Sequence, residues 1–450
     1  MKTTTLSILA GFLLTAMPVA EAQAQQQWTL RDCIDYAMEH NIQLKQNALQ
    51  QESSSEDVKQ SKAALLPSLS FSTNQSLSYR PFPNGGGTTV TNGFIDTKVS
   101  STTYNGSYGL NANWTVWNGN RNRNTVRQNE LAEQKAALTA EQTANSIQEQ
   151  IAQLYVQILY NTESINVCKQ VLEFSKANLE RGKAMMTAGA IARADVAQLE
   201  AQVASDEYSL VAAEGQVARF KMQLKQLLEL TGPQDFTIAV PAASDDAALA
   251  VIPSLNDAYN VALQKRPEMK SAQLGIESAK LQQEIAKAGN LPTIGVNGSI
   301  GASTSSGSSN SWGKQMKSNL NGGVGVNLSQ PIFDQRQART NVNKARIQLE
   351  EQQLQLQNAE KELWSTIEGY WLDANTNQAR FRSAQISTQS AQESYNLVSE
   401  QFKEGLKNIQ ELTTGKSTLL NAEQSRLESK YTTILSIQML KFYSGEEINL

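Results

Sequence analysis

The chain repeats itself, and this duplication limits the possible folds more than any other feature. Residues 29–70 align with residues 254–295 at a constant shift of 225 positions, with eleven identities and no gap. Further along, the shift becomes 216, which pairs Gly109 with Gly325 and Gly189 with Gly405 and leaves nine extra residues in the first copy. We therefore expect one structural unit that occurs twice along the chain.

Each copy begins with a helical pattern that leads to a Leu-Pro step. Residues 29–66 carry apolar side chains on one helical face, and Asn41 offers a break. In the second copy, the pattern predicts one helix over residues 254–290, just before Leu291-Pro292.

After each Leu-Pro step the period changes from helix to strand. From Pro67 to Tyr79 the residues alternate, with Leu69, Phe71, Thr73, Gln75, Leu77 and Tyr79 on one side and serine or asparagine on the other, and the alternation resumes from Tyr104 to Val116. In the second copy the same alternation covers residues 294–302 and 320–328. A period of two predicts strands with one apolar and one polar face. Each copy should therefore form a hairpin, with polar loops over residues 80–100 and 303–318, the latter containing Trp312.

A helical period then begins near Asn120 and continues almost to Gly189, with apolar residues at the 3-4 spacing of a heptad seam. At the rise of an α-helix, this element would be about 100 Å long. Gly182 and Gly189 bracket a predicted turn, and a return helix with the same spacing ends near Leu230. The first copy should therefore contain a long antiparallel coiled-coil hairpin.

The second copy continues in the same way. Its seam residues follow one another at intervals of seven: Val342, Leu349, Leu356, Leu363 and Tyr370. A break is expected at Glu404-Gly405, and a return helix should reach Tyr443. Between the two copies, residues 236–253 form a linker in which Phe236 to Val240 could add a short strand.

The N-terminus has the pattern of a secretory signal peptide. Lys2 precedes an apolar run from Leu6 to Ala20, and Ala22-Gln23-Ala24 follows. We expect cleavage after Ala24. The run is shorter than the roughly 20 residues of a membrane-spanning helix, which disfavours the alternative of an uncleaved anchor. No cysteine lies beside the cleavage site to carry a lipid.

Composition argues against several classes of function. The net charge of -4 leaves no basic footprint for nucleic acid. The two cysteines, Cys33 and Cys168, form no disulfide framework and are expected to be buried as small apolar residues. The only histidine is His40, and we find no metal-ligand cluster, phosphate-binding glycine loop or catalytic constellation. We therefore expect no enzyme, no metal and no cofactor.

The predicted strands need a partner for their apolar face. The long helices are committed to their own seams, so a bilayer is the environment that would cover these side chains. Lipid tolerates no open sheet edge, and single-chain barrels begin at eight strands. Four strands per chain therefore predict an oligomer, in which two, three or four copies would close a barrel of 8, 12 or 16 strands.

The order of these elements resembles the TolC-like outer-membrane efflux proteins over essentially the whole mature chain. Each half reads helix, Leu-Pro, strand, loop, strand, aromatic turn, long helix, glycine tip and return helix, with aromatic turns at Trp117-Asn118-Gly119 and Phe333-Asp334-Gln335. The resemblance implies an α+β homotrimer, with a 12-stranded barrel in the outer membrane of a Gram-negative cell and a 12-helix tunnel in the periplasm. The expected segments are a signal peptide (1–24), a first repeat (25–235), a linker (236–253) and a second repeat (254–450).

The resemblance also implies a passive export duct that works with a periplasmic adaptor and an inner-membrane pump. At the gate, a basic-to-acidic contact between hairpins falls on Lys407 and Asp195, and an acidic selectivity ring falls on Glu411. Phe402 replaces a gate tyrosine, and Thr414 replaces a second acidic position. The residues expected at the tips to dock the adaptor and pump are Gly189, Ala190, Gly405 and Leu406.

Two alternatives to this interpretation remain open. Without the resemblance, the gate candidates would be read as an ordinary solvated helix face. A periplasmic adaptor or structural protein would also contain a coiled-coil hairpin, but an adaptor normally flanks one hairpin with compact β domains, whereas this sequence has two hairpins and amphipathic strands.

Overall fold

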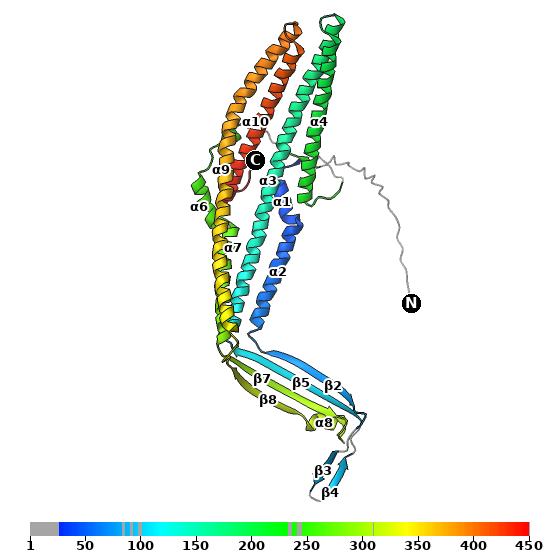
Figure 1. Cartoon of the computed structure of the whole chain (residues 1–450), viewed down its shortest axis with the longest axis vertical. Coiled ribbons are helices and arrows are strands. Elements are labelled where there is room, and N and C mark those ends of the chain that lie inside the picture. Colours follow the sequence, from blue (N-terminus) through cyan, green and yellow to red (C-terminus); the bar gives the residue numbers. More distant parts are fainter. Residues whose placement is uncertain are drawn as a thin grey trace, which may run out of the picture.

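A computed structural model describes residues 27–82, 86–90, 93–97, 101–232, 236–240, 245–308 and 310–449. The predicted signal peptide lies outside these residues. The molecule is long and mostly helical, with a β-sheet at the end opposite the tips of its longest helices (Figure 1).

Four antiparallel strands form the main sheet: β2 (Ser68–Tyr79), β5 (Thr102–Trp117), β7 (Thr293–Ser305) and β8 (Asn321–Ser329). Their order is β2-β5-β7-β8, so the hairpins of the two halves lie side by side and β2 and β8 form the edges. The register aligns Phe71 with Leu110 and Leu110 with Ile300 on one face. The predicted alternation is therefore confirmed across the sheet.

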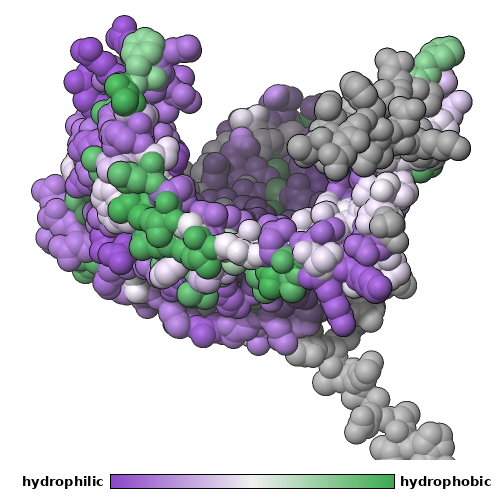
Figure 2. Space-filling model, turned by 90° about the horizontal axis from the view of Figure 1, so that it is seen from below, coloured by the Kyte–Doolittle hydropathy of each residue, from purple (hydrophilic) through white to green (hydrophobic). Residues whose placement is uncertain are grey.

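The apolar face of this sheet is exposed in the single chain. Leu69, Phe71 and Val324 keep 74%, 65% and 83% of their surface accessible. Figure 2 views this end of the molecule, where hydrophobic residues gather on the outer side of a hollow with a mostly hydrophilic visible wall.

The long helices are α3 (Arg121–Thr187), α4 (Arg193–Leu227), α9 (Gln337–Lys403) and α10 (Ile409–Tyr443). Both α3 and α9 contain 67 residues, about 100 Å at helical rise. Along α3, the predicted seam is buried at Ile147, Ile151 and Ile158. Gly182 does not lie at a turn as expected, because α3 continues through it to Thr187. The missing side chain of Gly182 instead leaves room for Leu199 of α4.

Helices α3 and α9 each begin at a sharp turn that follows a strand. The residues that precede them, Asn120 and Arg336, have positive φ angles of 65° and 71°. This left-handed conformation reverses the chain direction over a few residues, at a steric cost for residues other than glycine. Asp334 supports the second turn because its Oδ2 accepts a hydrogen bond from the Ala338 N–H at 2.6 Å.

Shorter helices pack along the long ones. In the first half, α1 (Leu30–His40) and α2 (Ile42–Ala63) meet at the predicted break, Asn41. In the second half, α6 (Leu255–Lys265) and α7 (Pro267–Lys287) are followed by the 3₁₀ turn η1 (Ala288–Asn290). The prediction of one helix over residues 254–290 is therefore wrong, because Pro267 starts a new helix and holds Arg266 in an extended conformation.

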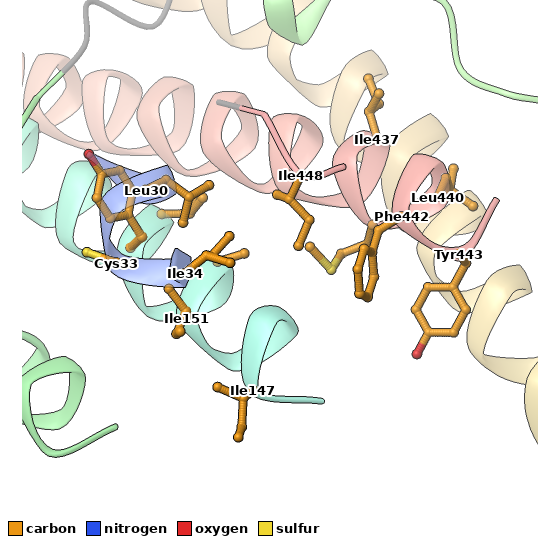
Figure 3. Packing of buried hydrophobic residues seen from close by; sticks show 14 of the residues in the cluster. Leu30, Cys33, Ile34, Ile147, Ile151, Ile437, Leu440, Phe442, Tyr443 and Ile448 are labelled. Atoms are coloured by element: carbon orange, nitrogen blue, oxygen red, sulfur yellow. The ribbon is translucent and has the colours of Figure 1, made fainter. Parts of the chain in front are cut away.

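The largest apolar core lies where the short helices meet the long ones. In Figure 3, Leu30, Cys33 and Ile34 of α1 lie beside Ile151 of α3. A small parallel sheet borders this core, formed by β1 (Gln27–Trp28) and β6 (Thr237–Ile238). Its β6 strand falls within the expected short strand, whereas β1 was not expected. The Tyr155 hydroxyl donates to the Ala239 carbonyl at 2.6 Å and ties this sheet to α3.

Both loops of the sheet contain secondary structure that was not expected from the sequence. The first contains a hairpin of β3 (Gly86–Val90) and β4 (Gly93–Thr97). The second contains α8 (Trp312–Ser318), so residues 303–318 are not simply a polar loop. Gln315 of α8 accepts a hydrogen bond from the Ser305 N–H at 2.7 Å, and Asn319 donates to the Ser303 carbonyl at 2.6 Å. These contacts provide hydrogen-bond partners for backbone groups of β7 that lie beyond the end of β8.

The helices pack side by side in a definite order (Figure 1). Helices α2 and α4 contact α3 on one side, while α7 and α10 contact it on the other, and α9 packs beyond α7 and α10. A short helix, α5 (Asp245–Ala248), contacts α10. Within the described ranges, no helix combines the length and apolarity of a membrane span.

Candidate functional site

The two hairpin tips face each other across a groove of about 830 Å³, called here the tip groove. One side is formed by the turn between α3 and α4, and the other by the turn between α9 and α10. Its lining residues are Met185, Gly189, Ala190, Ile191, Ala192, Asp195, Phe402, Gly405, Leu406, Lys407, Asn408, Ile409 and Glu411. All of the predicted gate and docking residues therefore border one space.

The first tip turn depends on a glycine in the left-handed conformation. Gly189 has a φ angle of 76° and no neighbouring atom where a side chain would begin. The N–H groups of Gly189 and Ala190 donate to the Met186 and Met185 carbonyls, which closes the C-terminus of α3. Asp195 then caps α4, because its Oδ2 accepts the Ala192 N–H at 3.0 Å.

The second tip turn is built in the same manner. Gly405 has a φ angle of 72°, and the Leu406 N–H donates to the Gln401 carbonyl at 2.9 Å. A capping box starts α10: the Glu411 N–H donates to Asn408 Oδ1 at 2.9 Å, and the Asn408 N–H donates to Glu411 Oε2 at 3.1 Å. This capping box was not expected from the sequence, although the spacing from Asn408 to Glu411 is its usual signature.

Lys407 contacts a carboxylate of its own hairpin. Its Nζ lies 2.6 Å from Glu411 Oε1, and both side chains are partly exposed. The hydrogen bond from Lys407, followed by that from the Asn408 backbone, lowers the pKa of Glu411. Asp195 borders the same groove but is engaged by the Ala192 N–H. The contact between Lys407 and Asp195 stays a prediction.

Phe402 is buried rather than free in the groove. Only 2% of its surface is accessible, and it belongs to an apolar cluster drawn from both hairpins: Leu199, Ala391, Tyr395, Phe402, Ile409, Leu412, Leu419 and Ala422. At the rim, Leu406 is 74% exposed, which leaves an apolar side chain uncovered beside Gly405. The tips thus combine an apolar base, a charged groove and a small exposed rim.

Other reactive side chains are accounted for structurally. His40 ends α1, where its ring stacks on Tyr36 at a centroid distance of 4.0 Å. Cys33 and Cys168 are buried, as predicted, and burial raises the pKa of the Cys33 thiol to about 12. In the part of the chain that the structure describes, no group of three or more His, Cys, Asp or Glu side chains could hold a metal ion.

Comparison with known proteins relates both the sequence and the fold to outer-membrane channels. Residues 33–229 and 258–446 match the family described as "Outer membrane efflux protein". Outer membrane protein TolC of Salmonella enteritidis is 22% identical over 369 residues, which cover 75% of this chain and 73% of that protein.

Solved structures share the fold at lower sequence identity. The CusC structure superimposes with a TM-score of 0.77 at 16% identity, and 93% of this chain and 92% of that chain are covered. VceC from Vibrio cholerae gives a TM-score of 0.75 at 17% identity, with coverage of 93% and 97%.

Proposed function

The chain belongs to the outer membrane efflux protein family, and we propose that it is a trimeric channel-tunnel through which cargo leaves the cell. It is an outer-membrane protein of a family made up of channels rather than enzymes. One observation carries the proposal furthest: a four-stranded sheet with two unpaired edges and an exposed apolar face continues directly into the long helices.

The sheet supports assembly within lipid. Unpaired backbone groups in a bilayer cost several kcal/mol each, so β2 and β8 need partners there. Pairing β2 of one copy with β8 of the next satisfies both edges without any change within the chain. Three copies would then close a barrel of 12 strands, with the apolar face toward lipid and the polar face toward the lumen.

The helices support the same neighbours. On α4, an outer face carries exposed Tyr208, Val211 and Met222, while on α9 the exposed apolar residues are Ile347, Leu354, Leu372, Ile386 and Leu397. These two helices are the outermost members of the helical layer at its opposite sides. Packing α4 of one copy against the tip half of α9 of the next, and α2 against its sheet half, would cover these residues and continue the barrel as a 12-helix tunnel (Figure 1).

The tips would form the periplasmic entrance, which meets an adaptor and an inner-membrane pump. The small exposed rim at Gly189, Ala190, Gly405 and Leu406 suits docking of other helical tips. Three copies of Glu411 around the axis would concentrate negative charge and favour cations. Opening then requires the hairpins to separate at the tip groove, where Lys407 and Asp195 lie on opposite sides.

The alternative, a periplasmic adaptor or structural protein, fits less well. A soluble protein would leave Leu69, Phe71, Val324 and their neighbours exposed to water on a two-edged sheet. Such a surface favours aggregation unless lipid or another chain covers it.

Single-channel conductance in planar bilayers tests the proposal. We expect the wild type to form discrete channels of low conductance, and Lys407→Ala and Asp195→Ala to conduct more because the tips are held less firmly. Glu411→Gln should reduce the preference for cations and the block by multivalent cations. Lys403→Ala is the matched control, since this tip lysine contacts Glu400 on its own helix.

Two results would contradict different parts of the proposal. If the purified wild-type protein forms no channels, the proposed channel function is wrong. If the wild type and all three gate variants have the same conductance and selectivity, the gate assignment is wrong. These residues then belong to an ordinary solvated helix face.

A further inference from the structure

A buried ion pair joins the two long hairpins near their tips. Lys416 of α10 places its Nζ 2.6 Å from Oδ2 of Asp206 on α4 and 3.0 Å from Oγ of Ser175 on α3. The Ser175 hydroxyl donates to the same carboxylate oxygen, and the Gln202 amide donates to Asp206 Oδ1 at 3.0 Å. The side chains of Lys416 and Asp206 are only 4% and 8% exposed.

In the part of the chain that the structure describes, this pair has no equivalent elsewhere between the two hairpins. Among the described residues, it is the only ion pair that connects a residue of α3 or α4 with one of α9 or α10. Burial lowers the pKa of Lys416, although the contact with Asp206 opposes that shift. The other buried lysine of α10, Lys430, lies 3.0 Å from Asp245 in α5 and so does not join the hairpins.

The position of Lys416 is unusual for a charged residue. It lies on the buried face of α10 between Leu412 and Leu419, which belong to the apolar cluster at the tips. A buried charge at a seam position weakens packing in general, but it fixes which groups must face each other. Lys416 is also nine residues beyond Lys407, about 14 Å along a helix.

Separating this pair differs from separating a surface pair. An exposed contact such as Lys407 with Glu411 can exchange its partner for water at little cost. When the hairpins begin to part at the layer that contains this pair, Asp206 keeps Ser175 and Gln202 of its own hairpin, whereas Lys416 loses both Ser175 and Asp206 while it is still buried. Leaving a buried charge without its partner is strongly unfavourable. Any motion that opens the tips is therefore easiest if it stops at this layer.

We propose that Lys416, Asp206 and Ser175 form a polar clamp at the root of the gate, so that the hairpins part from the tips to this layer and stay joined at it. The inference rests on the proposed function, because it needs an entrance that opens. The polar clamp would set the length of the moving segment and hence the width of the open entrance. These three residues are positioning residues, since they lie below the tip groove and do not line it.

A double-mutant cycle in planar bilayers tests the clamp. Lys416→Met and Asp206→Leu each leave one buried charge unpaired, so each single variant should raise the closed-state conductance about threefold or more. The double variant leaves no unpaired charge and should return to within about twofold of the wild type. Lys430→Met is the matched control and should conduct like the wild type.

Cysteine cross-linking locates where the hairpins separate. Gln198→Cys with Gln410→Cys reports on the tip side, and Glu163→Cys with Tyr431→Cys reports on the far side, because these side chains contact each other across the two hairpins. A short bis-maleimide spans the gap that the smaller cysteine side chains leave. In Lys407→Ala, the tip-side yield should fall and the far-side yield should persist. When Lys416→Met and Asp206→Leu are added to Lys407→Ala, both the tip-side and the far-side cross-linking yields should fall. Cys33 and Cys168 are buried, so they should not compete.

The outcomes separate this inference from the proposed function. Wild type without channels would contradict the proposed function, whereas wild-type channels with unaltered single clamp variants would overturn only the clamp. A double variant whose effect equals the sum of the singles would also overturn it. If a single variant fails to assemble, the cross-linking result in the double variant decides, and an unchanged far-side yield is the contradicting result.

Discussion

At the scale of single residues, the two tip acids share one structural task. Asp195 and Glu411 are separated by the same shift of 216 that relates the second part of the two repeats. Each accepts the N–H of the residue three positions earlier and so caps α4 or α10. Their presence in both tips is therefore explained by helix capping, and any role in gating would be added to that task.

The contact between Lys407 and Glu411 predicts how cation preference depends on pH. The hydrogen bond from Lys407, and then the Asn408 N–H, lowers the pKa of Glu411 below its ordinary value of 4.5. A carboxyl group whose pKa is lowered stays charged at every pH above its ordinary pKa. It loses its charge as the pH falls through the lowered pKa. Reversal potentials in a salt gradient should therefore show cation preference that persists at pH 4.5 and fades below it.

Removal of Lys407 supplies the matching comparison. In Lys407→Ala the carboxylate loses its main stabilising partner, so the pH at which cation preference disappears should rise toward the ordinary value of Glu411. Lys403→Ala should leave that pH unchanged, since Lys403 contacts Glu400. A midpoint that is identical in the wild type and Lys407→Ala would contradict the assignment of Glu411 as the titrating group.

For single residues, the sequence predicted which residues lie near one another better than which side chains contact each other. The residues that the family resemblance indicated do border one groove. They lie in or next to the turns at Gly189 and Gly405, so the conformation of these turns determines where they lie. The partner of Lys407 and the burial of Phe402 depend on side-chain packing between helices, which no local pattern specifies. The pair of Lys416 and Asp206 was missed for the same reason, because its members are 210 residues apart.

At the scale of elements, α9 has two apolar faces with different tasks. Ile367, Ala374 and Phe381 follow one another at intervals of seven and are fully buried within the chain. Of the predicted seam, Leu363 is buried, while Val342, Leu349 and Leu356 are half-buried. Leu354 and Ile386, which are 65% and 70% exposed, lie on the outer stripe that we assign to a neighbouring copy.

The two faces should respond differently to truncation. Ile367→Ala removes a fully buried side chain and should lower the free energy of unfolding of the chain by about 2–5 kcal/mol. Leu354→Ala removes an exposed side chain and should leave the unfolding of the separated chain nearly unchanged, while it lowers the fraction of trimer in dilute detergent. Melting curves and size-exclusion profiles measure both effects. A Leu354→Ala variant that destabilises the separated chain as much as Ile367→Ala would refute the division.

Element types were predictable where a period runs for many residues. The alternation from Pro67 to Tyr79 and the seam of α3 identified strands and helices correctly. The short elements escaped because their cause is not local. The two-residue strand β1 exists through its pairing with β6, far along the chain, and α8 is held by contacts of Gln315 and Asn319 with the edge of β7.

At the scale of the whole molecule, the chain is incomplete in a specific way. Its sheet ends in two free edges, and its outermost helices carry exposed apolar stripes on opposite sides of the layer. Both kinds of unsatisfied surface point to the same neighbouring copy, which is why the sheet and the helices support one assembly. The free edges were expected from the count of four strands, whereas their identity as β2 and β8 required the observed strand order.

Pairing of β2 of one copy with β8 of the next would close the proposed barrel, and disulfide cross-linking tests this pairing. The test combines Ser70→Cys with Gly325→Cys, Asn327→Cys or Ser329→Cys in turn, all on the polar face near the helical end of the sheet. Within one chain, β5 and β7 separate these positions by about 14 Å, too far for a disulfide.

Oxidation of the purified protein should give covalent species that end at a closed trimer for at least one pair, while each single-cysteine variant gives no such ladder. Monomers alone for all three pairs, or a ladder that ends at two or four copies, would contradict the trimeric barrel.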